Sequence, residues 1–251
     1  MADASYPVGA AATTIRVTEA LADGGEMGVT ELATELGLSK SAVHKHLTTL
    51  EQLGYVVGEG GRYRLGLGFL SVGLAARDRL VLYRTGRTVA DDLAGTTGEI
   101  TSLVVPESGE GVYAYQATAD RERDTWLRIG ERAPLHATAG GKAILAHLPT
   151  ERVAAIVDGG LPAFTDGTQT EPDRLRRELD SIRERGLAFD RGEYRADWQC
   201  VAAPVLVDGR VIGSITVSGP TERMSGKTLE EDVAGLVVSA SNAIEVASLS
   251  E

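Results

Sequence analysis

The sequence contains a single cysteine, so no disulfide bond can form within the chain, which is typical of a reducing compartment. It has no run that approaches the roughly 18 consecutive apolar residues of a membrane-spanning helix. Its first residues, MADASYPVGAAATTI, lack the basic region and the apolar stretch of a secretory signal. These absences predict a cytoplasmic protein that does not contact a membrane.

Lysine is also scarce, because only four of the 25 cationic residues are lysines, and the formal net charge is −11. Carboxylates stay hydrated in concentrated salt, which screens their mutual repulsion, so this composition is typical of a halophilic archaeon. A GC-rich genome is the alternative explanation, since it also replaces lysine by arginine. With 251 residues, 43% of them hydrophobic, the chain is long enough for two domains that each bury a core.

Two short helices joined by a tight turn are predicted by the stretch VTELATELGLSKSAVHKHLTTLEQLGYVV, which begins at Val29. The first helix begins near Thr30 and ends at Gly37, and Ser39 is a suitable N-cap for the second. In the second helix, apolar residues recur every three or four positions and so share one buried face: Val43, Leu47, Leu50 and Leu53. The other face carries polar and cationic side chains suited to phosphates and base edges in a major groove: Lys40, Ser41, His44, Lys45, Thr48 and Thr49. Ser39, at the start of this helix, is also expected to contact DNA. This pattern predicts a DNA-binding helix-turn-helix; a helical hairpin with a solvated charged face is the alternative.

A β-hairpin is predicted directly after these helices. Tyr55–Val57 begins a strand, Gly58–Gly61 has the composition of a turn, and Arg62–Leu65 forms the returning strand. A hairpin in this place defines a winged helix. Arg62 and Arg64 then lie on or near the wing, within reach of phosphate.

Residues 11–66 are therefore expected to form a winged helix-turn-helix domain that begins with a helix over residues 11–21. Three apolar residues of that helix are available to the core: Ile15, Val17 and Leu21. Although the whole chain is acidic, residues 38–64 carry a local excess of two positive charges. DNA binding is thus expected to be local and sensitive to salt.

A linker helix is predicted over residues 67–80. The sequence GLGFLSVGLAARDR is amphipathic, with Leu67, Leu70 and Leu74 on one side. Such a helix connects two domains, and its apolar side also suits pairing with a second copy of the chain.

A mixed pattern of helices and strands is predicted for the second domain, residues 81–251. Helices are expected at 81–94, 139–147, 151–157, 172–185 and 229–249. Strands are expected at 100–105, 111–117, 126–129, 201–207 and 211–218. The fold class is α+β, with an antiparallel sheet that carries helices on its faces.

Five segments together resemble the IclR family of transcription regulators. SKSAVHKHLTTLEQLGYV is similar to the recognition helix of that family, and GRYRLGLGFLSVG is similar to its wing and linker. PLHATAGGKAILAHLP, LAFDRGEYRADWQCVAAPV and GSITVSGP resemble three signatures of its effector domain, in the same order. The resemblance implies a GAF-like effector-binding domain and a homodimer or dimer of dimers on a pseudo-palindromic operator. It also implies a small organic-acid or sugar-derived effector and control of catabolic genes.

The effector site implied by the resemblance begins at Ala139 and Gly140. Amide groups at a helix start point outward with partial positive charge, so they suit a carboxylate. The remaining positions carried over from the family are Asp190, Trp198, Cys200, Thr216 and Ser218. Asp190 suits an effector hydroxyl, and Thr216 and Ser218 alternate along one strand and so face the same side. Trp126 is a looser candidate for the same pocket.

The chain departs from the family pattern at two positions. Asp197 replaces a glycine three residues before the cysteine, and aspartate tolerates unusual backbone angles. Gly192 replaces a glutamate, although Glu193 follows it. Both changes affect a loop beside the expected pocket.

Other motifs point to functions different from transcription regulation. Ala143 follows Lys142, where a phosphate loop requires serine or threonine, so nucleotide binding is not expected. His136 and Cys200 suggest a thiol catalyst or a metal site, but no second cysteine supports a closed metal site. We therefore expect no catalytic residues, no metal and no cofactor. An enzyme domain that uses Cys200 or Asp190, and a promoter-bound dimeric module without an effector, remain the alternatives.

Overall fold

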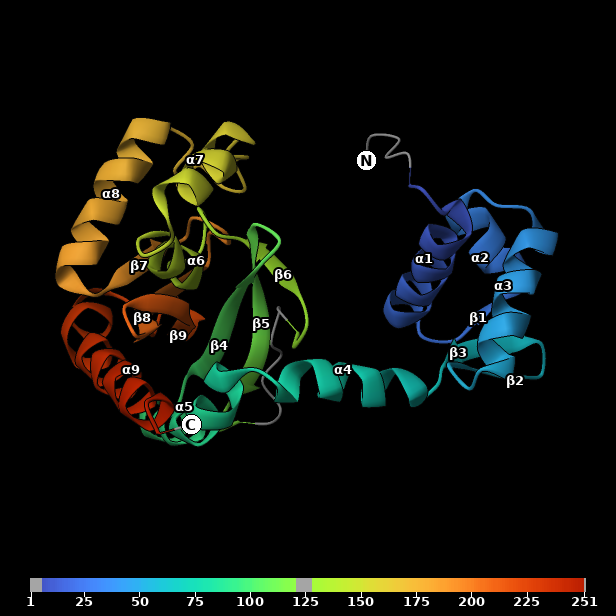
Figure 1. The fold of residues 1–251 in the computed structure, drawn as a ribbon, viewed down its shortest axis with the longest axis horizontal. Coiled ribbons are helices and arrows are strands. Elements are labelled where there is room, and N and C mark those ends of the chain that lie inside the picture. The colour runs from blue at the N-terminus through green and yellow to red at the C-terminus, as the bar shows by residue number, and fades with distance from the viewer. Residues whose placement is uncertain (1–5, 121–127, 251) are drawn as a thin grey trace. The chain divides into compact units, whose positions relative to one another are not determined.

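The computed structural model describes residues 6–120 and 128–250. The chain forms two compact units, Met1–Ala76 and Arg77–Glu251, and the division between them falls within the helix α4 (Gly68–Asp78). Figure 1 shows the elements of both units along the chain.

The first unit consists of three helices and a small antiparallel sheet. Its elements are α1 (Gly9–Gly24), β1 (Met27–Gly28), α2 (Val29–Leu36), α3 (Lys40–Gln52), β2 (Val56–Glu59) and β3 (Arg62–Leu65). The strands pair in the order β1-β3-β2, so the predicted hairpin is present and β1 adds a third strand to it. The three helices and the sheet enclose a core that includes Val17, Leu21, Leu32, Val43, Leu47 and Val56.

The turn of the helix-turn-helix uses the residues that the sequence predicts for it. Gly37 ends α2 with a left-handed backbone, φ 66°. Ser39 caps α3, because its hydroxyl oxygen accepts a hydrogen bond of 3.2 Å from the amide of Ala42. The helix α2 begins at Val29, one residue before the predicted start, and the Glu31 carboxylate accepts from the Gly28 amide at 2.7 Å.

Several apolar residues expected inside are exposed. Ile15 is 55% exposed, because it lies on the face of α1 opposite Val17 and Leu21. Leu53 is 65% exposed, because α3 ends at Gln52 and Leu53 lies beyond its last turn. The helix α4 buries none of its side chains within the single chain, and Leu70 on it is 56% exposed.

The second unit contains a six-stranded sheet in which every pair of neighbours is antiparallel, in the order β6-β5-β4-β9-β8-β7. The strands are β4 (Ile100–Glu107), β5 (Glu110–Ala117), β6 (Arg132–Pro134), β7 (Ala188–Arg191), β8 (Trp198–Val207) and β9 (Arg210–Pro220). The expected α+β class with an antiparallel sheet is confirmed. The expected strand 126–129 is wrong where it can be checked, because residues 128 and 129 are not in a strand; Trp126 lies outside the described residues.

Helices cover both faces of this sheet, and each face has its own core (Figure 1). One face packs against α5 (Val81–Thr97) and α9 (Ala234–Ser248), which follows a π-helical segment at Thr228–Val233. The other face packs against α6 (Ala139–Leu145), α7 (Thr150–Asp158) and α8 (Pro172–Arg185). Side chains alternate accordingly, so Val201 and Ala203 lie in the first core and Cys200 and Ala202 in the second.

Gly141 allows α6 to lie directly against the turn before it. A Cβ atom at this position would overlap the backbone of Leu135, which cannot move aside as a side chain would. We predict that Gly141→Ala lowers the free energy of unfolding by about 3 kcal/mol, at the upper end of overpacking effects.

The matched control is Gly95→Ala in α5, where an added Cβ meets no atom within 4 Å. There alanine is expected to stabilise the helix by up to about 1 kcal/mol. Chemical denaturation of both variants measures the difference, and equal stabilities would contradict this account of α6.

Candidate functional site

One face of α3 presents the side chains predicted to meet DNA. Lys40, Ser41, His44 and Lys45 are exposed and Thr48 is half-buried, whereas Val43, Leu47 and Leu50 are buried on the opposite face. His44 Nδ1 and Thr48 Oγ1 are 3.4 Å apart. His46 is half-buried, and its Nδ1 lies 2.8 Å from the hydroxyl of Thr14. The polar face of α3 is therefore a continuous solvent-facing surface with two ammonium groups.

The two arginines of β3 differ in their surroundings. Arg62 forms ion pairs of 3.8 Å with Glu26 and 3.2 Å with Glu31, and it also donates to the carbonyl of Glu26. Arg64 is exposed and has no carboxylate partner among the residues that the structure describes. The guanidinium of Arg62 is thus held by its own unit, and Arg64 is the better placed of the two for phosphate.

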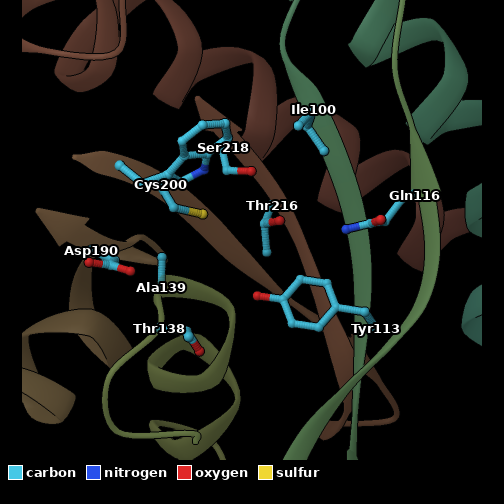
Figure 2. Close-up of a pocket in the computed structure, with 10 residues that line it drawn as sticks. Ile100, Tyr113, Gln116, Thr138, Ala139, Asp190, Cys200, Thr216 and Ser218 are labelled. Carbon is cyan, nitrogen blue, oxygen red and sulfur yellow. The ribbon is translucent and has the colours of Figure 1, made fainter. Parts of the chain in front are cut away.

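A pocket lies in the second unit between the start of α6 and the sheet (Figure 2). Its lining residues come from β4, β5, the turn into α6, β7, β8 and β9, and they are Ile100, Tyr113, Gln116, Thr138, Ala139, Asp190, Trp198, Cys200, Thr216 and Ser218. Figure 2 shows Tyr113, Cys200 and Thr216 pointing toward the same space. The lining therefore combines aromatic and aliphatic walls with hydroxyl, amide and carboxyl groups, as in most small-molecule sites.

Six of the seven residues predicted for the effector line this pocket, and Gly140 does not. Gly140 lies behind the lining, where its carbonyl accepts a 3.1 Å hydrogen bond from the hydroxyl of Ser214. A Cβ at Gly140 would come within 2.8 Å of the Thr216 methyl group, so the glycine allows α6 to approach the sheet. Because Ala139 and Gly140 are the first residues of α6, their amides have no intrahelical acceptor.

Sequence reasoning missed four lining residues: Ile100, Tyr113, Gln116 and Thr138. Gln116 could have been identified from the sequence, because it is a polar residue in a mostly apolar stretch of its strand. The face on which Tyr113 lies was not predictable by alternation alone, because a β-bulge between Leu103 and Val104 shifts the register of β4 against β5.

The space inside this pocket is small, since it offers only about 20 Å³ to the centres of water molecules. That volume holds little more than one water. A metabolite therefore requires some lining side chains to move, and the half-buried Trp198 is the largest of them.

Lys142 lies beside the pocket and is completely buried. Its ammonium group binds the carboxylate of Glu178 on α8 at 2.6 Å and also the carboxylate of Glu193. Burial alone lowers the pKa of Lys142, but the two carboxylates outweigh this effect and the pKa is raised. Lys142 thus connects α6, α8 and the loop that follows β7.

Two acids next to Lys142 ionise at unusually high pH. Burial raises the pKa of Asp190 to about 6, although backbone hydrogen bonds and the charge of Lys142 act in the opposite direction. Burial raises the pKa of Glu193 to about 7, again against the charge of Lys142. Both groups therefore change charge close to neutral pH.

The loop between β7 and β8 explains both departures from the family pattern. Gly192 has φ 84°, a left-handed conformation, and the Glu193 that follows it reaches Lys142. Asp197 does not need unusual backbone angles, because the only described non-glycine residues with positive φ are Ser108 and Asp208. Instead, Asp197 binds Arg195 through both carboxylate oxygens, at 2.7 and 3.0 Å.

A thiol catalyst or metal site finds no support among the described residues. The Nε2 atom of His136 lies 3.0 Å from the carbonyl of Pro162 and the ring lies near Phe164, so it does not act as a base for Cys200. No cluster of three or more His, Cys, Asp or Glu side chains able to hold a metal occurs within residues 6–120 and 128–250. Over the same residues, no helix has the length and apolar character needed to cross a membrane.

Two family profiles match the chain: "IclR helix-turn-helix domain" over residues 11–60 and "Bacterial transcriptional regulator IclR C-terminal" over residues 75–246. The chain belongs to the IclR family. It is accordingly a DNA-binding transcription regulator and not an enzyme, as the sequence predicts. Regulators of this family typically respond to a ligand.

The chain is 32% identical to a probable transcriptional regulator, ArcR, of Halobacterium salinarum, with 92% of this chain and 90% of that protein covered. It is 34% identical to the regulator KdgR of Escherichia coli, over 88% of this chain and 85% of that protein. Among solved structures, the Thermotoga maritima IclR shares 25% identity with a TM-score of 0.82, and covers 96% of this chain and 99% of its own. An IclR homologue from Microbacterium hydrocarbonoxydans complexed with 4-hydroxybenzoate shares the fold, with 23% identity and a TM-score of 0.84 over 96% of this chain and all of that one.

Cys200 is expected to be chemically inert in the native protein. Burial raises the pKa of its thiol far above the usual range, so almost none is present as the reactive thiolate. A thiol reagent at pH 8 should therefore label native protein much more slowly than protein in denaturant. Equal labelling rates in the two states would contradict this description of the pocket wall.

Proposed function

We propose that this chain is a metabolite-responsive regulator that binds a pseudo-palindromic operator as a homodimer or dimer of dimers. The observation that carries the proposal is the pairing, in one chain, of a winged helix-turn-helix with a polar surface on α3 and a lined pocket in the second unit. We also propose that it acts in the cytoplasm, that it controls catabolic genes, and that its source is a halophile, to which the Halobacterium salinarum relative lends some support.

The proposed DNA contacts lie on α3 and the wing. Base edges and phosphates meet Ser41, His44, Lys45 and Thr48, while Lys40, next to the Ser39 cap, and Arg64 contact the backbone phosphates. Arg62 is proposed to hold the wing in place through Glu26 and Glu31 rather than to bind phosphate. Because few cations serve each half-site on a strongly acidic protein, two copies are needed for useful affinity.

The proposed effector is a small carboxylate that carries a hydroxyl or a related polar group. Its carboxylate would lie at the start of α6 near Ala139 and Gly140, where free amide groups and the helix dipole favour an anion. Asp190, Thr216 and Ser218 offer partners for polar groups, and Trp198 and Cys200 form apolar walls. Tyr113, Gln116 and Thr138 extend this set.

Removal of the Lys45 ammonium tests the DNA surface. We predict that Lys45→Ala weakens binding to DNA sequences selected by the wild-type protein by at least tenfold at fixed salt. The slope of log affinity against log salt should also become less steep, by about one for each phosphate that a protomer no longer neutralises. Fluorescence anisotropy over a range of salt concentrations measures both quantities.

The matched control is Lys227→Ala, because Lys227 is an exposed lysine of the second unit. It should leave both affinity and salt dependence at wild-type values. If the two variants bind DNA equally well, the proposed role of α3 is wrong.

Thermal unfolding with a panel of hydroxy, keto and aromatic carboxylates tests the effector site. A ligand at 100 times its Kd stabilises the native state by about 2.7 kcal/mol, which is readily seen as a rise in Tm. At least one member of the panel should raise the Tm of the wild-type protein but not of Thr216→Val, which removes a pocket hydroxyl with little change in shape. No shift with any acid would favour the alternative of a promoter-bound module without an effector.

A further inference from the structure

Lys142 is one of only four lysines in the chain and is the one that is completely buried. A lone ammonium in such a place is strongly unfavourable unless it is paired and hydrogen-bonded. The structure supplies Glu178, whose side chain is 30% exposed, and Glu193, whose side chain is 13% exposed. The pairing therefore holds two distant segments of sequence against α6.

Glu193 transmits this pairing to the pocket. Its backbone amide donates a 2.6 Å hydrogen bond to Oδ1 of Asp190, the acid that lines the pocket. Its backbone carbonyl accepts from the hydroxyls of Thr165, at 3.0 Å, and Thr168, at 2.6 Å. The side chain and the backbone of Glu193 are thus both fixed. The position of Asp190 therefore depends on where Lys142 holds Glu193.

The charges of this cluster do not balance. Glu178, Glu193 and Asp190 are three carboxyl groups close to a single ammonium, and Glu178 is the most exposed of them. The second carboxyl oxygen of Glu193, Oε2, is buried and has no hydrogen-bond partner. Two buried acids facing one shared cation cannot both ionise without a large desolvation penalty. One proton retained on Asp190 or Glu193 reduces the imbalance by one charge.

We propose that Lys142 is the positioning residue of the effector pocket, and that the two acids whose loop it holds, Asp190 and Glu193, retain a proton whose presence favours an anion in the pocket. This inference rests on the effector site proposed above. The groups that face the pair from the surrounding elements are Lys142 of α6, Glu178 of α8, Tyr113 of β5, Cys200 of β8 and the neighbouring Tyr194. Lys142 is the only cation among them, so a carboxylate effector adjoining the two acids adds a further negative charge and makes loss of the retained proton harder.

The effect on binding has a definite sign. Above neutral pH the pair loses its proton and repels a carboxylate, whereas at lower pH the retained proton removes that repulsion. Affinity for an anionic effector should therefore fall as pH rises, by up to about tenfold per pH unit when one proton is taken up on binding.

Carbon-13 NMR of the full-length, ligand-free protein with labelled carboxyl groups tests directly whether the two acids retain a proton near neutral pH. The Glu193 and Asp190 signals, identified by their loss in Glu193→Gln and Asp190→Asn, should titrate between about pH 6 and 7. In Glu178→Gln the Lys142 ammonium has Glu193 as its remaining ion-pair partner. The midpoint pH of the Glu193 titration should therefore fall. The control Glu184→Gln changes an exposed acid of α8, the helix that also carries Glu178. It should leave the midpoint pH of Glu193 unchanged.

Two results would overturn the proposal whatever the ligand does. Ionisation of both acids down to pH 5 would show that neither retains a proton near neutral pH. An unchanged Glu193 midpoint in Glu178→Gln would show that the Lys142 cluster does not control this pair.

Calorimetric titration of acetate and of 4-hydroxybenzoate into the same protein at pH 6, 7 and 8 tests the coupling. Affinity should fall with pH in the wild type and in Glu184→Gln, but not in the double variant Asp190→Asn/Glu193→Gln. Binding of either acid that does not depend on pH in the wild type would contradict the coupling. If neither acid binds at any pH and no acid of the panel raises the Tm, the carboxylate effector proposed above is refuted, while the NMR titration still decides the role of Lys142.

Discussion

Burial of the Lys142 ammonium is the constraint on which the second unit depends. Removing one partner from a buried ion pair typically destabilises a protein by about 3–5 kcal/mol, because a charge is left without compensation. Here the partners come from α8 and from the loop after β7, far from Lys142 in sequence. The helix α6, the helix α8 and the loop that orients Asp190 must therefore assemble together. The pocket lies where these segments meet the sheet.

A different constraint applies to the first unit, which must bind polyanionic DNA although the chain carries a net charge of −11. Lys40 and Lys45 lie on the exposed face of α3, with Val43 and Leu47 buried behind them, and we propose that they meet this constraint. Of the three arginines in this unit, Arg62 is neutralised locally by Glu26 and Glu31. Binding by a few exposed cations is sensitive to salt, which favours a multivalent arrangement on two half-sites.

The sequence predicted the elements whose signals are local. Ser39 and Gly37 define the turn of the helix-turn-helix by cap chemistry, and the predicted bounds of α8 agree with the structure because its apolar period and its first proline are unambiguous. The four-residue strand β7 was not predicted, because its pairing with β8 is a long-range contact without a local pattern. Six pocket residues were identified by resemblance rather than by physics. The partners of Lys142 could not be found from sequence, since nothing in the spacing of Glu178 and Glu193 indicates that they meet.

In the function that we propose, a carboxylate bound near Asp190 changes how strongly α3 holds DNA. Such a coupling requires that the ligand bind the DNA-competent and DNA-incompetent states with different affinities. The most direct test is the Kd of the full-length protein for its selected DNA, with and without a saturating carboxylate that raises its Tm, in the wild type and in Asp190→Asn. The account predicts a change of at least fivefold in the wild type, or about 1 kcal/mol, and a much smaller change in the variant. The same Kd with and without the acid in the wild type would contradict it.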